Sequence, residues 1–95
     1  TLLDLGAGDG VLTALLSSGF QTVFAVEKED RFIRSLELIP GIQVISSRME
    51  SVTEFPFFDI ALLSYSYDGI PTSDKPSFLQ RLFKSRKDDG AILLV

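Results

Sequence analysis

The 95-residue sequence lacks both cysteine and histidine. Without cysteine, the chain can form neither disulfide bonds nor thiolate metal sites. Without histidine, it lacks the commonest metal ligand and the commonest general base, so we expect no metal and a chemistry that needs no imidazole. The longest apolar runs are too short to span a bilayer, and no signal peptide precedes the first predicted strand. These absences predict a cytoplasmic protein that does not bind membranes.

Basic residues are also in short supply. The chain has 9 Lys and Arg against 13 Asp and Glu, which gives a formal net charge of −4. This balance argues mildly against a nucleic-acid surface. The hydrophobic content of 45% is enough for the core of one small folded domain.

The first ten residues are the most informative part of the sequence. Residues 2–5 include three leucines and read as a strand buried on both faces, and residues 11–16 are apolar at helical spacing. Gly6, Gly8 and Gly10 lie between them. Glycine has no Cβ, so this loop can turn sharply and let a ligand approach the N–H groups of the following helix. The pattern predicts the ligand crevice of a doubly wound α/β sheet, at the carboxyl end of its first strand.

The spacing of the glycines distinguishes two kinds of ligand. The dinucleotide fingerprint G-x-G-x-x-G would need a third glycine where Val11 stands. The observed pattern is D-x-G-x-G-x-G beginning at Asp4. It resembles the first motif of class I S-adenosylmethionine-dependent methyltransferases, in which an acidic residue precedes G-x-G-x-G.

A second acid strengthens this resemblance. The next predicted strand, residues 22–26, ends at Glu27. An acid at the tip of a second parallel strand can accept hydrogen bonds from both hydroxyls of a ribose. The glycine triplet alone could be an ordinary turn between a strand and a helix, but the pair is far more specific than either half.

The rest of the chain alternates strands and helices. A second helix is expected from Glu29 and Asp30 to Pro40 and Gly41, and a third is capped by Asp74. Further strands are expected at residues 42–45, 58–63 and 91–95, the last entered through a turn at Asp89 and Gly90. The helices should bury Phe32, Ile33, Leu36, Phe78, Leu79, Leu82 and Phe83. The predicted fold is α/β, a doubly wound, mostly parallel sheet of order 3-2-1-4-5, which is the Rossmann-like core that the resemblance implies.

The resemblance implies S-adenosylmethionine as the cofactor. Asp4 would hold the glycine loop and reach the methionine amino group, and Glu27 would bind the ribose. After the third strand, Met49 would donate its amide to the adenine and Glu50 would lie near the exocyclic amine, although Glu50 could instead begin a short solvated helix. The full predicted cofactor set is Asp4, Gly6, Ala7, Gly8, Gly10, Glu27, Lys28, Arg48, Met49, Glu50 and Ser64.

Catalytic residues are less well indicated. The Asn/Asp-Pro-Pro-Tyr motif of some amino-methylating enzymes is absent after the fourth strand. Tyr65 and Tyr67 could form a wall of the sulfonium pocket, and Asp68 could orient or deprotonate a nucleophile. The alternatives are aromatic packing and an Asp-Gly turn. The basic residues Arg81, Lys84, Arg86 and Lys87 are interpreted as a solvated helix end, with an RNA-contacting patch as the alternative.

The predicted function is transfer of a methyl group from S-adenosylmethionine to an acceptor that the sequence does not identify, whether a small molecule, a protein or RNA. One alternative is an NAD-dependent oxidoreductase, whose pyrophosphate would face Asp4 and Asp9 unfavourably. The other is a non-catalytic, methyltransferase-like binding module. Because the sequence begins inside one predicted strand and stops inside another, we expect residues 1–95 to be a methyltransferase core truncated at both ends.

Overall fold

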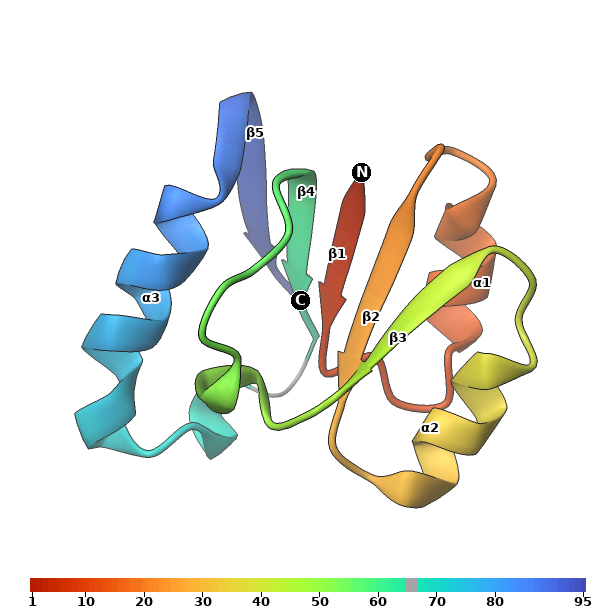
Figure 1. Cartoon of the computed structure of the whole chain (residues 1–95), viewed down its shortest axis with the longest axis horizontal. Helices are drawn as coiled ribbons and strands as arrows, with labels where there is room; N and C mark the ends of the chain where they lie inside the picture. Colours follow the sequence, from red (N-terminus) through yellow and green to blue (C-terminus); the bar gives the residue numbers. More distant parts are fainter. Residues whose placement is uncertain (65–66) are drawn as a thin grey trace.

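The described residues form one five-stranded sheet at the centre of the molecule (Figure 1). The computed structural model describes residues 1–64 and 67–95. The strands are β1 (Leu2–Leu5), β2 (Val23–Glu27), β3 (Ile42–Ser46), β4 (Phe58–Leu63) and β5 (Arg86–Leu94). Their order is β3-β2-β1-β4-β5 and each neighbouring pair is parallel, which confirms the predicted fold class and strand order.

Helices cover both faces of the sheet (Figure 1). The α-helices are α1 (Val11–Ser17), α2 (Asp30–Glu37) and α3 (Lys75–Lys84). The loops of the described residues contain three single-turn 3₁₀ helices: η1 (Met49–Ser51), η2 (Tyr67–Gly69) and η3 (Thr72–Asp74). None of the helices in the described part of the chain has the length and apolar character needed to cross a membrane.

The side chains of β1 divide between the two faces because successive residues of a strand point in opposite directions. Leu3 and Leu5 belong to a buried cluster with Phe78 and Leu82 of α3. Leu2 belongs to a second cluster, against which α1 packs. All four residues of β1 are buried, as expected for a central strand of a parallel sheet.

The predicted burial of the helices is confirmed for most positions but is wrong for Phe83. Ile33, Leu36, Phe78 and Leu82 are buried, and Phe32 and Leu79 are half-buried. Phe83 is 55% exposed. One residue along a helix turns the side chain by about 100°, so Phe83 lies beyond the face that carries Leu82 into the core.

The prediction for the last strand is also wrong at its beginning. We expected a turn at Asp89 and Gly90 before a strand at residues 91–95, but β5 already begins at Arg86. The pairing with β4 shifts register, because Phe58 pairs with Arg86 whereas Ile60 pairs with Ala91. The extra residues form a bulge in which Asp89 has a φ of 63°, a left-handed conformation that Asp tolerates better than most residues.

Candidate functional site

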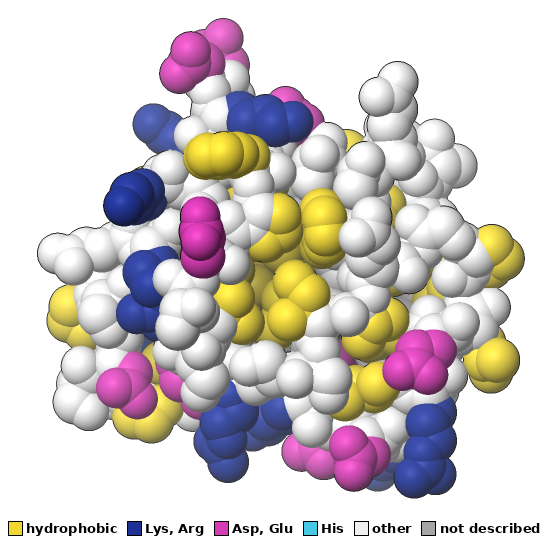
Figure 2. All heavy atoms as spheres, viewed as in Figure 1, with side chains coloured by type: hydrophobic (Ala, Val, Ile, Leu, Met, Phe, Trp, Pro, Cys, Tyr) yellow, Lys and Arg dark blue, Asp and Glu magenta, His cyan; other side chains and the backbone are white. Residues whose placement is uncertain are grey.

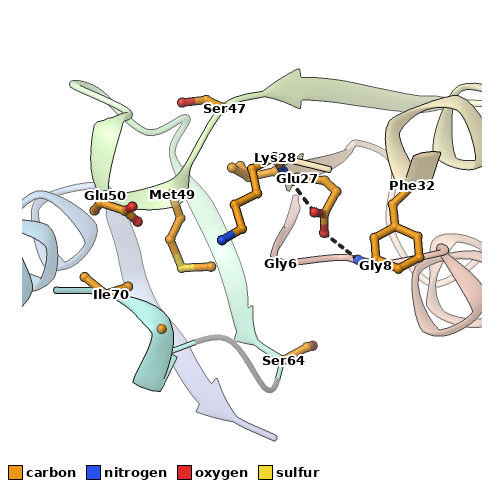
Figure 3. Close-up of a pocket in the computed structure, with 12 residues that line it drawn as sticks. Gly6, Gly8, Glu27, Lys28, Phe32, Ser47, Met49, Glu50, Ser64 and Ile70 are labelled. Atoms are coloured by element: carbon orange, nitrogen blue, oxygen red, sulfur yellow. Dashed lines mark hydrogen bonds between the residues drawn. The ribbon is translucent and has the colours of Figure 1, made fainter. Parts of the chain in front are cut away.

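A pocket of about 230 Å³ lies at the carboxyl ends of β1 to β4 (Figure 3). The strand order reverses between β1 and β4, and in open α/β sheets ligands bind at this place. The described residues that line the pocket are Gly6, Gly8, Val26, Glu27, Lys28, Phe32, Ser47, Met49, Glu50, Ser64, Gly69 and Ile70. Seven of the eleven residues predicted from the sequence are among them: Gly6, Gly8, Glu27, Lys28, Met49, Glu50 and Ser64.

The glycine loop has left-handed backbone conformations at Gly6, Gly8 and Gly10, where φ is 75°, 61° and 87°. These conformations are strained for other residues. A Cβ at Gly10 would lie 2.7 Å from Cδ1 of Ile39, so Gly10 is needed for packing against α2 and the residues after it. A Cβ at Gly8 would meet no described atom within 4 Å. Gly8 therefore faces open space at the pocket, whereas Gly10 is buried away from it.

Glu27 connects the glycine loop to the end of β2 (Figure 3). Its side chain is buried, and Oε1 accepts a hydrogen bond from the Gly8 amide at 2.8 Å. Oε2 accepts hydrogen bonds from the amides of Lys28 and Glu29, each at 3.0 Å. One carboxylate thus fixes the glycine loop relative to the start of α2.

Asp4 connects β1 to α1 and to the end of β4. It is only 1% exposed, and Oδ2 accepts a hydrogen bond from the Thr13 hydroxyl at 2.6 Å. Oδ1 accepts a longer one, 3.5 Å, from the Ser64 hydroxyl. Asp4 itself is not among the described lining residues of the pocket, so its predicted contact with a methionine amino group stays a prediction.

The ionisation of Asp4 gives a prediction about pH. Burial raises the pKa of Asp4 above its ordinary value of 3.8, the hydrogen bonds from Thr13 and Ser64 oppose this, and the nearby charge of Glu27 adds to it. Because the folded chain then binds this proton more tightly than the unfolded chain, the carboxyl contributes most stability below pH 3.8 and loses it as pH rises through the raised pKa.

The Asp4→Asn variant cannot ionise at this position. We therefore expect its free energy of unfolding to lack the decline with rising pH that Asp4 causes in the wild type. Urea denaturation of both proteins at about pH 4 and about pH 7 measures the difference. The stability of the wild type relative to the variant should be lower at the higher pH. A relative stability that rose with pH would contradict the assignment.

The loop after β3 forms the opposite wall of the pocket. Met49 and Glu50 belong to η1, and both line the pocket (Figure 3). Glu50 thus fits both interpretations, since it lies in the first turn of a short helix and also lines the pocket. Arg48 is 62% exposed, with Nη1 3.7 Å from Oε1 of Glu50, and it lines a neighbouring polar hollow.

Four predicted cofactor residues lie outside the described pocket lining: Asp4, Ala7, Gly10 and Arg48. Five lining residues were not predicted: Val26, Phe32, Ser47, Gly69 and Ile70. Phe32 was assigned to the core, but its ring lies beside Gly8 (Figure 3). The sequence did contain a signal for this position. Phe32 lies in the first turn of α2, and α2 follows Glu27 and therefore begins at the pocket edge of the sheet.

The catalytic candidates stay predictions. Tyr65 lies outside the described residues. The ring of Tyr67 packs against Phe78, with centroids 6.5 Å apart, and Nζ of Lys75 lies 5.0 Å from its centroid. Asp68 is exposed. The described pocket lining includes neither Tyr67 nor Asp68, although it includes the residues that follow them.

The basic residues near the end of α3 differ from one another. Figure 2 shows Lys and Arg side chains over α3 and the start of β5 with acidic side chains between them, so this surface is not of one sign. Lys84, Arg86 and Lys87 are exposed, as expected for a solvated helix end. Arg81 is half-buried and donates hydrogen bonds to backbone carbonyls. The prediction of a solvated helix end is therefore wrong for Arg81.

The fold is similar to that of solved methyltransferases. An S-adenosylmethionine-dependent methyltransferase from Clostridium acetobutylicum matches 98% of this chain with a TM-score of 0.87 and 20% identity, over 41% of its own length. A methyltransferase from Leishmania major matches 98% of this chain with a TM-score of 0.85 and 21% identity, over 40% of its own length. Phosphoethanolamine N-methyltransferase 1 from Haemonchus contortus was solved with phosphoethanolamine and S-adenosylhomocysteine. It matches 98% of this chain with a TM-score of 0.86 and 18% identity, over 21% of its own length.

These likenesses establish the fold of the chain. It spans less than half of the length of each of these three proteins. No protein-family model matches the sequence, and no curated protein matches it.

Proposed function

We propose that this chain binds S-adenosylmethionine in the pocket at the strand ends and forms the core of an enzyme that transfers its methyl group. The observation that carries the proposal is the pairing of Gly8 with Glu27. Gly8 leaves open space beside the pocket, and the carboxylate that holds its amide is the acid at the tip of β2. The fold shared with solved methyltransferases supports the same conclusion.

Each wall of the pocket has a proposed role. Glu27 accepts hydrogen bonds from the ribose hydroxyls. Met49 and Glu50 face the adenine, with Glu50 accepting a hydrogen bond from its amino group. Gly6 and Gly8 let the cofactor approach the backbone. Met49 is also the one methionine in the chain, and its flexible thioether suits a flat adenine face.

Two observations disfavour a dinucleotide. The third glycine of the dinucleotide fingerprint permits close packing of helix on strand, but Val11 stands at that position and is 63% exposed. The Val11 amide also donates a hydrogen bond to the Asp9 carboxylate at 3.1 Å. A negative charge therefore already occupies the start of α1, where a pyrophosphate would have to bind.

The chain's part in methyl transfer is mainly to position the reactants. S-adenosylmethionine supplies a methyl group on a positively charged sulfur, which is itself the leaving group. The residues of the chain hold the adenosine end of the cofactor and keep the methyl group in line with the acceptor. Such a reaction does not need histidine when the acceptor is a neutral amine. The cytoplasmic location stays a prediction.

Titration calorimetry of the intact protein with S-adenosylhomocysteine and with NAD tests the proposal. We expect S-adenosylhomocysteine to bind with a dissociation constant on the order of micromolar and NAD to give no measurable heat. Binding of NAD without binding of S-adenosylhomocysteine would favour the oxidoreductase. Binding of neither would contradict a cofactor role for the pocket.

A further inference from the structure

Arg81 makes a contact that joins two distant parts of the chain. Its Nε group donates a hydrogen bond to the carbonyl oxygen of Val52 at 3.0 Å, and its Nη2 group donates one to the carbonyl oxygen of Glu50 at 2.7 Å. Both bonds are partly buried. The planar guanidinium suits this arrangement because it presents several N–H groups in a fixed fork.

The acceptors of these bonds belong to the wall of the pocket. Glu50 lines the pocket, and Val52 is the C-cap residue that directly follows η1. A 3₁₀ helix of three residues has little stability of its own, and the carbonyl groups at its end have no partner within the helix. From the side of α3, Arg81 supplies a partner for the Glu50 carbonyl of η1 and for the Val52 carbonyl directly after it.

We propose that Arg81 is a positioning residue for the adenine wall of the cofactor pocket. It fixes η1, and through η1 it fixes the amide of Met49 and the carboxylate of Glu50. The inference rests on the proposed function, because it assigns Arg81 to the part of the pocket that recognises adenine. Arg81 does not itself line the pocket.

Other contacts hold the same segment to α3 and would remain without Arg81. The Ser85 hydroxyl donates a hydrogen bond to the Phe55 carbonyl at 3.0 Å. The rings of Phe55 and Phe78 meet edge to face, with centroids 5.8 Å apart. Loss of the Arg81 side chain should therefore loosen η1 without releasing the whole segment between β3 and β4.

The test compares two ligands in the intact protein by titration calorimetry. The first is S-adenosylhomocysteine. The second is S-inosylhomocysteine, in which oxygen replaces the adenine amino group, so that it presents an acceptor to Glu50. We expect the wild type to prefer the first ligand by about tenfold or more, because a carboxylate facing a second acceptor loses its hydrogen bond.

The Arg81→Ala variant should bind S-adenosylhomocysteine about tenfold more weakly and lose most of its preference between the two ligands. Arg81→Lys, which can keep at most part of the fork, should be intermediate. Lys84→Ala removes an exposed cation from the same helix and should behave like the wild type. Thermal melting of each variant shows whether it is folded.

The outcomes are distinguishable. A wild type that binds neither ligand would overturn the proposed function itself. A wild type that binds both equally would show that this wall does not read the amino group, which overturns the role given to Arg81. A folded Arg81→Ala protein whose affinities for the two ligands are unchanged, or fall by the same factor, would reduce Arg81 to a structural contact.

Discussion

The Gly8→Val variant is expected to fold but to lose measurable binding of S-adenosylhomocysteine. Gly8 has a φ of 61°, which a β-branched residue adopts only at a cost of about 1–3 kcal/mol. Since no described atom lies within 4 Å of a Cβ at this position, the new side chain would not collide with the core. It would instead fill space that the cofactor needs. Calorimetry measures the affinity and thermal melting measures the stability.

Gly41 offers a matched control for this variant. Its φ is 80°, and a Cβ there also meets no described atom within 4 Å, but Gly41 lies between α2 and β3 and outside the described pocket lining. Gly41→Val should therefore lower the melting temperature to a similar degree and leave the affinity unchanged. If Gly8→Val binds as well as Gly41→Val does, the glycine loop is only a turn.

The Glu27→Ala variant should bind S-adenosylhomocysteine about tenfold to a hundredfold more weakly. Hydrogen bonds to a carboxylate contribute about 1.5–3 kcal/mol each before the return of water is counted, and the variant loses those to the ribose. It also loses the bond that fixes the Gly8 amide. We expect the fold to persist with reduced stability, because β2 remains buried between β1 and β3.

Glu37→Ala is a suitable control because it removes one exposed acid from the end of α2. It changes the net charge by the same amount as Glu27→Ala but should leave the affinity unaltered. Equal affinities of the Glu27→Ala variant and the wild type would show that the acid at the tip of β2 does not bind the ribose.

The sequence predicted those parts of the fold that local patterns specify. Strands β1 to β4 are short apolar runs with glycine, proline or charged residues near their ends, and their bounds lie within one residue of the predicted ones. The start of β5 could not be predicted in this way. Its residues 86–89 are all charged and suggest a loop, but Arg86 pairs with Phe58 of β4 and the residues after it form the bulge.

The candidate site shows the same division. The glycine loop and Glu27 were found because the chain places each directly after a strand. Phe32 and Ile70 were missed, since they reach the pocket from a helix and from a loop whose course is set by tertiary packing. The contact of Arg81 spans 31 residues to Glu50, and no spacing in the sequence indicates it. The position of Arg81 in the sequence is equally compatible with an ordinary solvated helix end.

The hydrogen bonds of Glu27 determine how the proposed binding of a ribose would proceed. A carboxylate has about four acceptor positions, and the amides of Gly8, Lys28 and Glu29 use three of them. One position is then left for the two ribose hydroxyls of the proposed contact. On this proposal, binding would be an exchange of partners that releases the amide of Gly8, Lys28 or Glu29. The released amide would become a donor available to the ligand, so that ribose recognition would be coupled to an adjustment of the glycine loop or of the start of α2.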